Sequence, residues 1–411
     1  MGLYLDLNRD LTPAQVALKE QTHRFAEEVL RPASMELDKL PPGDVIKEGS
    51  TLWKVFRQAY EQGYHIRGFP EQLGGAGLGP MEQQIVGEEM GWGSADFGIA
   101  LGVTSMPYGF ALMSGNQDLM DEFVIPFAKD REAKYIGCWA ITEPHHGSDS
   151  VLFGTEQFHD PNITFDVKGL LDGDEWVING QKSAWVSNGT IATHALLFLT
   201  LDPSQGMAGS GIAIVPLNLP GVSKAPPLDK LGQRALNQGE IFFDNVRIPK
   251  HYMLVEPGTF PPIIDAILAG ANAGMGTLFT GVARAAFEEA LAYCKQRVQG
   301  GKPIAEHQLV QKKLFDMFTK VETARAISRA ASLYNQTVFP PQAQYSVAAK
   351  VYCTQAAYEV ASDAVQLFGG YGLCKELPVE KIFRDARASM IEDGTNEVLS
   401  LAAARLILER Y

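Results

Sequence analysis

Residues 391–397, which read Ile-Glu-Asp-Gly-Thr-Asn-Glu, carry the clearest chemical signal in the chain. Glu392 and Asp393 are adjacent carboxylates directly ahead of a Gly-Thr pair. A carboxylate can act as a general base when it comes within roughly 2.6–3.2 Å of the group that holds the proton. Either carboxylate is therefore a candidate for proton transfer.

Two other segments have the residue types of a cofactor site. Arg297 offers a forked guanidinium, which is the natural partner of a pyrophosphate. Gly369 and Gly370 permit the backbone to approach a cofactor closely. By contrast, histidines such as His65 and His251 lack a nucleophile partner in any recognisable motif, so histidine-based catalysis is not predicted.

The composition limits the class of protein. With 411 residues, the chain suits two or three domains. The net charge of −13 argues against a nucleic-acid ligand, because phosphate backbones demand clustered Lys and Arg. The cysteines lack CxxC spacing, which predicts reduced thiols and no metal site; they are Cys138, Cys294, Cys353 and Cys374.

Neither a targeting segment nor a membrane helix is predicted. The first seven residues, Met-Gly-Leu-Tyr-Leu-Asp-Leu, lack the basic region and the apolar run of a secretory signal. No apolar run approaches the ~18 residues that a membrane helix needs. We therefore expect a cytoplasmic protein without a membrane contact.

The positioning elements change type twice along the chain. Thr12-Pro13-Ala14-Gln15 is a capping box that predicts a helix ending near Pro32, and a second helix is expected at 51–62. From 134 to 249 the pattern becomes that of short strands, at 164–168, 176–178, 194–201, 211–216 and 240–248. Asp172-Gly173 and Asn179-Gly180 are predicted turns.

Helical patterns return after Pro262, at 262–299, 306–336, 342–368 and 395–410, and they are long enough for a bundle. The predicted fold is α+β. It has an N-terminal helical domain at 1–133, a middle β-barrel domain at 134–250 and a C-terminal four-helix bundle at 251–411.

Five motifs together resemble the acyl-CoA dehydrogenase family in order and spacing. They are Thr-Glu-Pro to Gly-Ser-Asp at 142–149, Asn-Gly-Gln-Lys at 179–182, Leu-Gly-Gln-Arg at 231–234, Gln-Leu-Phe-Gly-Gly-Tyr-Gly at 366–372 and Asp-Gly-Thr at 393–395. The resemblance implies FAD as cofactor, an acyl-CoA substrate, an electron-transfer flavoprotein as partner and a homotetramer built as a pair of dimers. It also implies the same helical, β, helical order that the pattern predicts.

The resemblance implies specific flavin contacts. In the family, the strand and loop around Thr-Glu-Pro touch the flavin and the thioester, and the next segment flanks the ring with an aromatic residue and a hydroxyl. Arg297 opens the pyrophosphate segment, and the Gly-Gly loop reaches the flavin of a neighbouring subunit. The cofactor residues expected here are Trp139, Ile141, Thr142, Ser148, Trp185, Ser187, Arg297, Gln308, Gln366, Gly369, Gly370, Thr395 and Glu397. In that family the 231–234 segment is mainly structural.

The implied reaction is α,β-dehydrogenation, in which a carboxylate removes the α-proton while a hydride passes to flavin N5. The family carries Glu at the base position, where this chain has Asp393. Three readings stay open. Asp393 is the base, or Glu392 turns inward, or the base has moved to the helix near 268–273, where the sequence has no carboxylate.

Departures from the family pattern bear on the substrate. Asp is about 1.5 Å shorter than Glu, and a 1 Å misplacement can cost about 100-fold in rate. Gly300 replaces a Phe, and Asn272 replaces an Arg that straight-chain members often carry. Together they predict a reshaped pocket for a cyclic or branched acyl group. Ser148, Asn272 and Asp96 are the expected substrate residues, although Asp96 is more simply a helix cap.

His145 and His146 also depart from the family, which has small residues there, and the spacing from Lys182 to Trp185 is one residue longer than usual. Three other functions compete. They are a nitroalkane-oxidase-like flavin oxidase, a straight-chain acyl-CoA dehydrogenase, and a non-catalytic or DNA-binding relative. The negative charge argues against the last.

Overall fold

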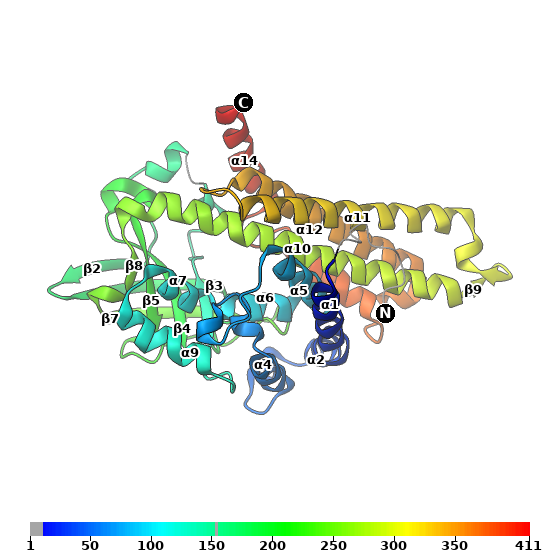
Figure 1. The fold of residues 1–411 in the computed structure, drawn as a ribbon, viewed down its shortest axis with the longest axis horizontal. Coiled ribbons are helices and arrows are strands. Elements are labelled where there is room, and N and C mark those ends of the chain that lie inside the picture. Colours follow the sequence, from blue (N-terminus) through cyan, green and yellow to red (C-terminus); the bar gives the residue numbers. More distant parts are fainter. Residues whose placement is uncertain (1–10, 153–154) are drawn as a thin grey trace.

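The computed structural model describes residues 11–152 and 155–411, so the N-terminal stretch that was searched for a signal lies outside it. Helices form the first region, from the capped start of α1 to residue 129 (Figure 1). They are α1 (Pro13–Phe25), α2 (Arg31–Leu37), α3 (Pro42–Ile46), α4 (Thr51–Glu61), α5 (Pro80–Gly93), α6 (Ala95–Thr104), α7 (Met106–Ser114), α8 (Gln117–Leu119) and α9 (Ile125–Lys129).

The start of α1 confirms the capping box. The Gln15 amide donates to Thr12 Oγ1 at 3.2 Å, and the Thr12 amide donates to Gln15 Oε1 at 3.0 Å. The predicted end near Pro32 is wrong, because helix continues through α2 to Leu37. A π-helical turn at Ala26–Leu30 precedes Pro32 and relieves the clash that a proline ring makes with the preceding turn.

The strands form one eight-stranded sheet at one end of the molecule (Figure 1). They are β1 (Gly137–Ala140), β2 (Lys168–Asp172), β3 (Glu175–Ser187), β4 (His194–Thr200), β5 (Ser210–Pro216), β6 (Val222–Lys224), β7 (Gln238–Pro249) and β8 (Met253–Val255). The pairs β3–β1, β1–β4, β4–β2 and β2–β3 close a ring. This closure agrees with the predicted barrel.

One of the two predicted turns is present. The chain turns between β2 and β3 after Asp172, which pairs with Glu175. At Asn179-Gly180 the turn prediction is wrong, because β3 runs straight through it. Its pairing with β7 shifts register between Ile178 and Gly180, and Gly180 takes φ +133°. The Asn-Gly pair marks a bulge here rather than a hairpin.

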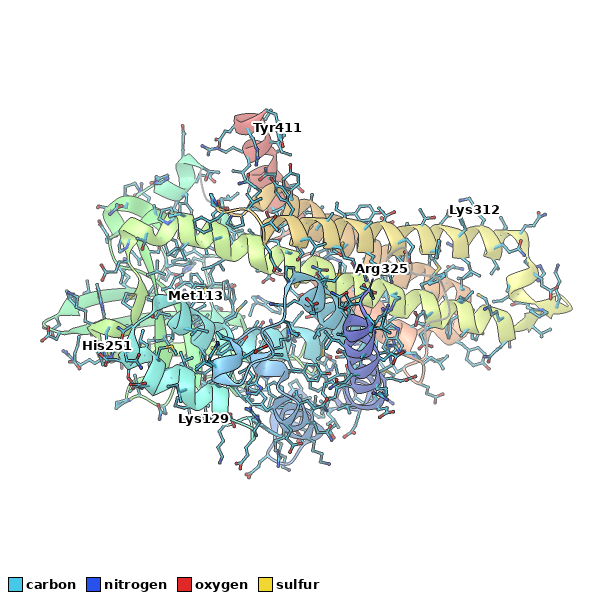
Figure 2. The ribbon with its side chains drawn as sticks, in the orientation of Figure 1. Met113, Lys129, His251, Lys312, Arg325 and Tyr411 are labelled. Carbon is cyan, nitrogen blue, oxygen red and sulfur yellow. The ribbon has the colours of Figure 1, made fainter. Side chains whose placement is uncertain are left out.

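The C-terminal helices form a long bundle (Figure 1). They are α10 (Phe260–Gln296), α11 (Gln308–Asn335), α12 (Ala343–Phe368), α13 (Pro378–Ser389) and α14 (Asn396–Arg410). Charged side chains are buried where α5 crosses the bundle. Arg284 and Arg325 contact Glu88 at 2.7 and 2.9 Å. Figure 2 shows Arg325 within the bundle and Lys312 on its outer face. The predicted α+β class and the helical, sheet, helical order are confirmed.

Two helical segments are long and apolar enough to span a membrane by length and composition, although the sequence predicted no membrane helix. They are Ala95–Ser114 and Pro257–Gln296. The apolar window of the second is 72% buried and that of the first 44% buried. Packing of α10 against α5, α11 and α12 accounts for its apolar composition.

Candidate active site

A cavity of about 800 Å³ opens between the sheet, helices α6 and α10, and the segment that joins α13 to α14. This volume is in the range of ~300–1,000 Å³ typical of ligand sites. Its apolar wall comes from α6, α7 and α10, namely Ile99, Val103, Met106, Leu268, Ala271 and Met275. The polar wall comes from β3, β7, α13 and the loops after β1, β6 and α13.

Asp393 lies on this cavity, in the segment between α13 and α14. Its backbone is left-handed, with φ +52°, a region that Asp and Asn tolerate better than other non-glycine residues. Burial raises the pKa of its carboxyl, and the nearby Lys350 partly offsets this rise. Gly394 follows at φ +92°, where a side chain would meet Leu399 at 3.0 Å.

Glu392 lines the same cavity as Asp393. Gln233 Nε2 donates to its carboxylate at 3.1 Å. Burial raises the pKa of Glu392 to about 7. The structure therefore brings two carboxylates to the cavity, and the Gln233 contact fixes one of them.

The two strongest sequence motifs meet at the cavity. Trp139, Ile141, Thr142 and Ser148 line it, as expected of residues that face a ligand. The Thr395 amide donates to Ser148 Oγ at 3.0 Å, which ties the loop after β1 to the Asp393 segment. Thr395 itself caps α14, with its Oγ1 accepting from the Val398 amide, and Glu397 is exposed to solvent. Neither of these two residues is among those that line the cavity.

Trp185 and Ser187 line the cavity from β3. The unusual spacing after Lys182 is accommodated by a bulge, since the β3–β7 register shifts between Lys182 and Val186. Ala184 takes φ +44° within it. The indole of Trp185 remains 55% exposed, which leaves an aromatic surface free for a ring. Ser187 Oγ accepts from Gln238 Nε2 at 3.2 Å.

The segment 231–234 was expected to be mainly structural, yet its residues 231–233 line the cavity together with the preceding Asp229 and Lys230. Lys230 Nζ donates to Gln238 Oε1 at 2.7 Å, and burial lowers its pKa to about 8. Gln233 holds Glu392 from this segment. The sequence does show a Lys and a Gln on either side of the Leu-Gly pair, and polar residues of this kind can line a site. Only the fold shows that they face the cavity.

A buried ion pair supports the loop after β1. Lys182 Nζ and Glu143 Oε1 are 2.6 Å apart, and both side chains are fully buried. Glu143 also accepts from the amides of Asp166 and Val167. The histidines unusual for the family are paired as well, His145 with Asp166 at 2.8 Å and His146 with Asp149 at 2.6 Å. These contacts hold the loop that carries Thr142.

The remaining cofactor residues lie elsewhere in this chain. Arg297, Gln308, Gln366, Gly369 and Gly370 are exposed, and none of them is among the residues that line the cavity. They lie near the short hairpin of β9 (Val298–Gln299) and β10 (Lys302–Pro303), at the opposite end of the molecule from the sheet (Figure 1). The guanidinium carbon of Arg297 is 5.9 Å from the centre of the Tyr371 ring. A single chain therefore does not gather the two sets into one site.

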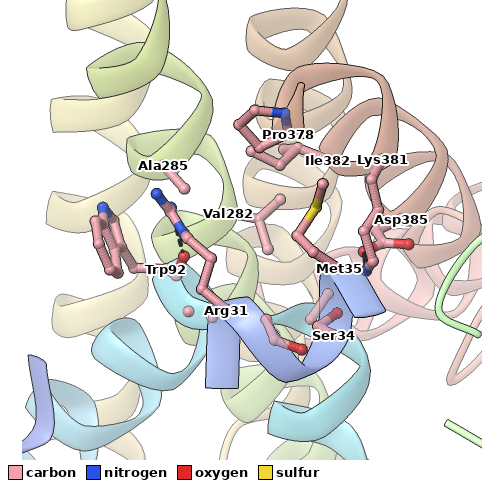
Figure 3. Close-up of a pocket in the computed structure, with 14 residues that line it drawn as sticks. Arg31, Ser34, Met35, Trp92, Val282, Ala285, Pro378, Lys381, Ile382 and Asp385 are labelled. Atoms are coloured by element: carbon pink, nitrogen blue, oxygen red, sulfur yellow. Dashed lines mark hydrogen bonds and ion pairs between the residues drawn. The ribbon is translucent and has the colours of Figure 1, made fainter. Parts of the chain in front are cut away.

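Asp96 does not line the cavity, so the substrate role expected for it needs correction. It is fully buried, and its carboxylate accepts from Ser34 at 2.9 Å, the Ala235 amide at 3.1 Å and Lys381 at 3.2 Å. The cap of α6 is Ser94 rather than Asp96. Lys381 and Asp385 border a gap of about 30 Å³, room for about one water (Figure 3).

Two departures that were expected to reshape the acyl pocket lie outside it. Asn272 is fully buried, and its Nδ2 donates to the Leu268 carbonyl at 2.8 Å instead of facing the cavity. Gly300 is in the β9–β10 hairpin, where Gly300 and Gly301 both take positive φ for the turn. Of the three departures, only Asp393 lies at the cavity.

Three family models match consecutive parts of the chain. They are the acyl-CoA dehydrogenase N-terminal domain over residues 12–131, the middle domain over 138–246 and the C-terminal domain over 264–408. The fold and the motifs at the cavity agree with them. The chain belongs to the acyl-CoA dehydrogenase family.

Individual relatives cover nearly the whole chain. The mitochondrial short-chain specific acyl-CoA dehydrogenase of Bos taurus is 32% identical over 407 residues, which is 98% of this chain and 92% of that protein. Butyryl-CoA dehydrogenase from Megasphaera elsdenii matches with a TM-score of 0.85 at 28% identity, covering 98% and 100% of the two chains. A chain from a structure of the electron transferring flavoprotein of Acidaminococcus fermentans also matches, with a TM-score of 0.85 and 29% identity over 98% and 100%.

These likenesses define an oxidoreductase that acts on acyl-CoA. Family members are flavoproteins, which implies FAD. The cavity fits such a cofactor, because the exposed indole of Trp185 and the hydroxyls of Thr142 and Ser187 line the same space.

Proposed function

We propose that the chain catalyses α,β-dehydrogenation of an acyl-CoA thioester, with Asp393 as the base that removes the α-proton. The observation that carries this proposal is the shared cavity of Asp393, Trp185, Ser187 and Thr142. Trp139, Thr142, Trp185 and Ser187 would hold the flavin ring, and FAD, when bound, supplies the acceptor for the β-hydride.

Asp393 is suited to hold a proton in this setting. Burial raises the pKa of its carboxyl, which makes it a stronger base than an exposed aspartate. The apolar wall of Ile99, Val103 and Leu268 would exclude water from an acyl chain. Glu392 is the competing base, but its hydrogen bond from Gln233 restrains it.

A ring-bearing or branched acyl group is the substrate that we favour. A base about 1.5 Å shorter than Glu needs the α-carbon held nearer, and a bulky acyl group pinned between α6 and α10 would hold it there. This argument rests on Asp393 alone, because Asn272 and Gly300 lie away from the cavity. Straight short chains are the second candidate, supported by the likeness to short-chain specific relatives.

The substrate test compares kcat/KM for cyclohexane- or cyclohexene-carboxyl-CoA with that for butyryl- and octanoyl-CoA. A preference for the cyclic thioester supports the bulky acyl group. A tenfold preference for a straight chain, about 1.4 kcal/mol of transition-state discrimination, would end that proposal.

The role of Asp393 has its own test. D393N preserves size and removes the base, so flavin binding and acyl-CoA binding should remain while anaerobic flavin bleaching slows by at least ~100-fold. Wild-type bleaching in D393N would move the base to Glu392.

We further propose an electron-transfer flavoprotein as the electron acceptor, a homotetramer as the assembly and the cytoplasm as the location. The exposed second set around Arg297 supports an assembly in which each subunit serves its neighbour's flavin. Rapid oxygen consumption without an added acceptor would instead favour the nitroalkane-oxidase-like alternative. A stable, flavin-loaded monomer would refute the assembly.

A further inference from the structure

A buried lysine stands behind the segment that carries the two carboxylates. Lys350 of α12 is fully buried. Its Nζ donates to the Gly394 carbonyl at 2.8 Å and to Asn396 Oδ1 at 2.8 Å. In the described part of the chain both of these acceptors are neutral groups, so the cation is not neutralised by a hydrogen-bonded carboxylate.

We propose that Lys350 is a positioning residue for Asp393, holding its backbone in place and supplying the positive charge that keeps its carboxylate available as a base. This inference rests on the proposed role of Asp393. Lys350 itself does not line the cavity and is not offered as a group that touches substrate.

The backbone of Asp393 takes a conformation that needs support. A non-glycine residue at φ +52° is held there by its surroundings, since such conformations cost of order 1 kcal/mol or more. The Gly394 carbonyl that accepts from Lys350 belongs to the very next residue. Ser148 holds the Thr395 amide one residue later. Lys350 thus anchors the residue that directly follows Asp393, as the Ala388 carbonyl anchors the amide of Glu392 directly before it.

Charged groups around Lys350 favour its protonated form. Asp393 and Glu392 of the same segment and Glu397 of α14 all favour the charged lysine, and burial opposes it. Burial lowers the pKa of Lys350 to about 8, so it is still mostly protonated at pH 7. For Asp393, Lys350 is the group that lowers the pKa against the effect of burial. Lys230, from the segment 229–233, lowers the pKa of Glu392 in the same way.

A purely structural lysine would be a poor choice for this position. A buried cation is costly unless it is well paired, and an apolar side chain of similar length would fill the same space. The chain nevertheless has a lysine here. A lysine can donate a hydrogen bond to a backbone carbonyl and can also stabilise the negative charge of a nearby carboxylate.

The test uses the flavin-loaded enzyme and three variants. K350M removes the donor and the charge, whereas K350Q removes the charge and retains a donor. T354V is the matched control, because Thr354 Oγ1 accepts from Asn396 Nδ2 at 3.0 Å from the same helix but carries no charge. If K350M does not fold, the comparison of K350Q with wild type still tests the role of the charge.

Three readouts are expected to move, and two of them are independent of activity. Amide exchange of the peptide 391–398 should accelerate at least tenfold in K350M. The titration midpoint of Asp393, read from the infrared carboxyl band that D393N lacks, should rise by at least one pH unit in K350M and K350Q, a tenfold change in proton affinity. The pH profile of flavin bleaching should move with it. T354V should leave that midpoint unchanged.

An unchanged midpoint in both K350M and K350Q would overturn the charge role. Exchange in K350M no faster than in T354V would overturn the anchoring role. If no acyl-CoA bleaches the wild-type flavin, the proposed function fails by itself, while the infrared and exchange results still decide what Lys350 does.

Discussion

Replacing Glu392 by glutamine tests how the cavity treats its second carboxylate. Burial raises the pKa of Glu392 from about 4.5 to about 7. The folded state therefore binds more protons than the unfolded state between these two pH values, and stability falls as pH rises through that window. E392Q removes this ionisation, and its side-chain oxygen can still accept from Gln233 Nε2.

The size of the effect follows from the two pKa values. One pKa unit corresponds to 1.36 kcal/mol, so an ionised Glu392 costs roughly 3 kcal/mol at pH 8. This figure is an upper bound, because Lys230 and Lys350 lose a negative neighbour in the variant. We expect E392Q to be more stable than wild type by up to about 3 kcal/mol at pH 8. The difference should vanish near pH 4.

Urea denaturation at several pH values measures this difference, at fixed protein and FAD concentrations because bound ligand shifts the midpoint. Flavin bleaching by acyl-CoA, measured on the same samples, should stay within about threefold of wild type. A variant that is less stable at pH 8, or a gain that does not depend on pH, would refute the reasoning about Glu392. A loss of bleaching of ~100-fold or more would identify Glu392 as the base.

Three further changes test other parts of the site. W185A should weaken FAD binding by about tenfold, since it removes the exposed indole from the cavity wall, and fluorescence titration of the apoprotein measures it. K182M should destabilise the protein by about 3–5 kcal/mol by leaving Glu143 buried without its partner, and thermal unfolding of K182M beside K182M/E143Q should show partial recovery in the double variant. If Arg297 binds the FAD pyrophosphate as the family resemblance implies, R297A should weaken FAD retention by about tenfold or more while the chain stays folded, because a charged hydrogen bond would be lost; unchanged retention in the assembled protein would remove Arg297 from the cofactor site.

Local patterns in the sequence predicted the fold class, and the resemblance to the family predicted the residues of one cavity wall. Strand-like runs and long helical periods established the order of the regions, and the motifs around Thr142, Trp185 and Asp393 proved to share a cavity. Shorter-range details were less secure. Pro32 did not end its helix, because a π-helical turn before it relieves the clash of the proline ring. Asn179-Gly180 did not form a turn, because the strand continues through it with a bulge.

Residues with distant partners could not be assigned from the sequence. Asp96 has the look of a cap or a pocket residue, but its environment is set by Lys381 from α13, which only the fold brings to it. Asn272 turns its amide back to its own helix. Nothing in the sequence indicated that Lys350 is buried near Asp393, because a single lysine in a helical pattern is ordinarily exposed.

The aspartate that we propose as the base has two physical explanations, and they differ in what they require of the substrate. One is reach, in which a shorter side chain demands a closer α-carbon. The other is backbone, because Asp accepts the left-handed conformation of φ +52° more readily than a longer side chain does. The second explanation places no demand on the acyl group. Because Asn272 and Gly300 lie outside the cavity, the expected preference for a bulky acyl group depends only on which explanation of Asp393 holds. The comparison of cyclic with straight-chain thioesters distinguishes the two explanations.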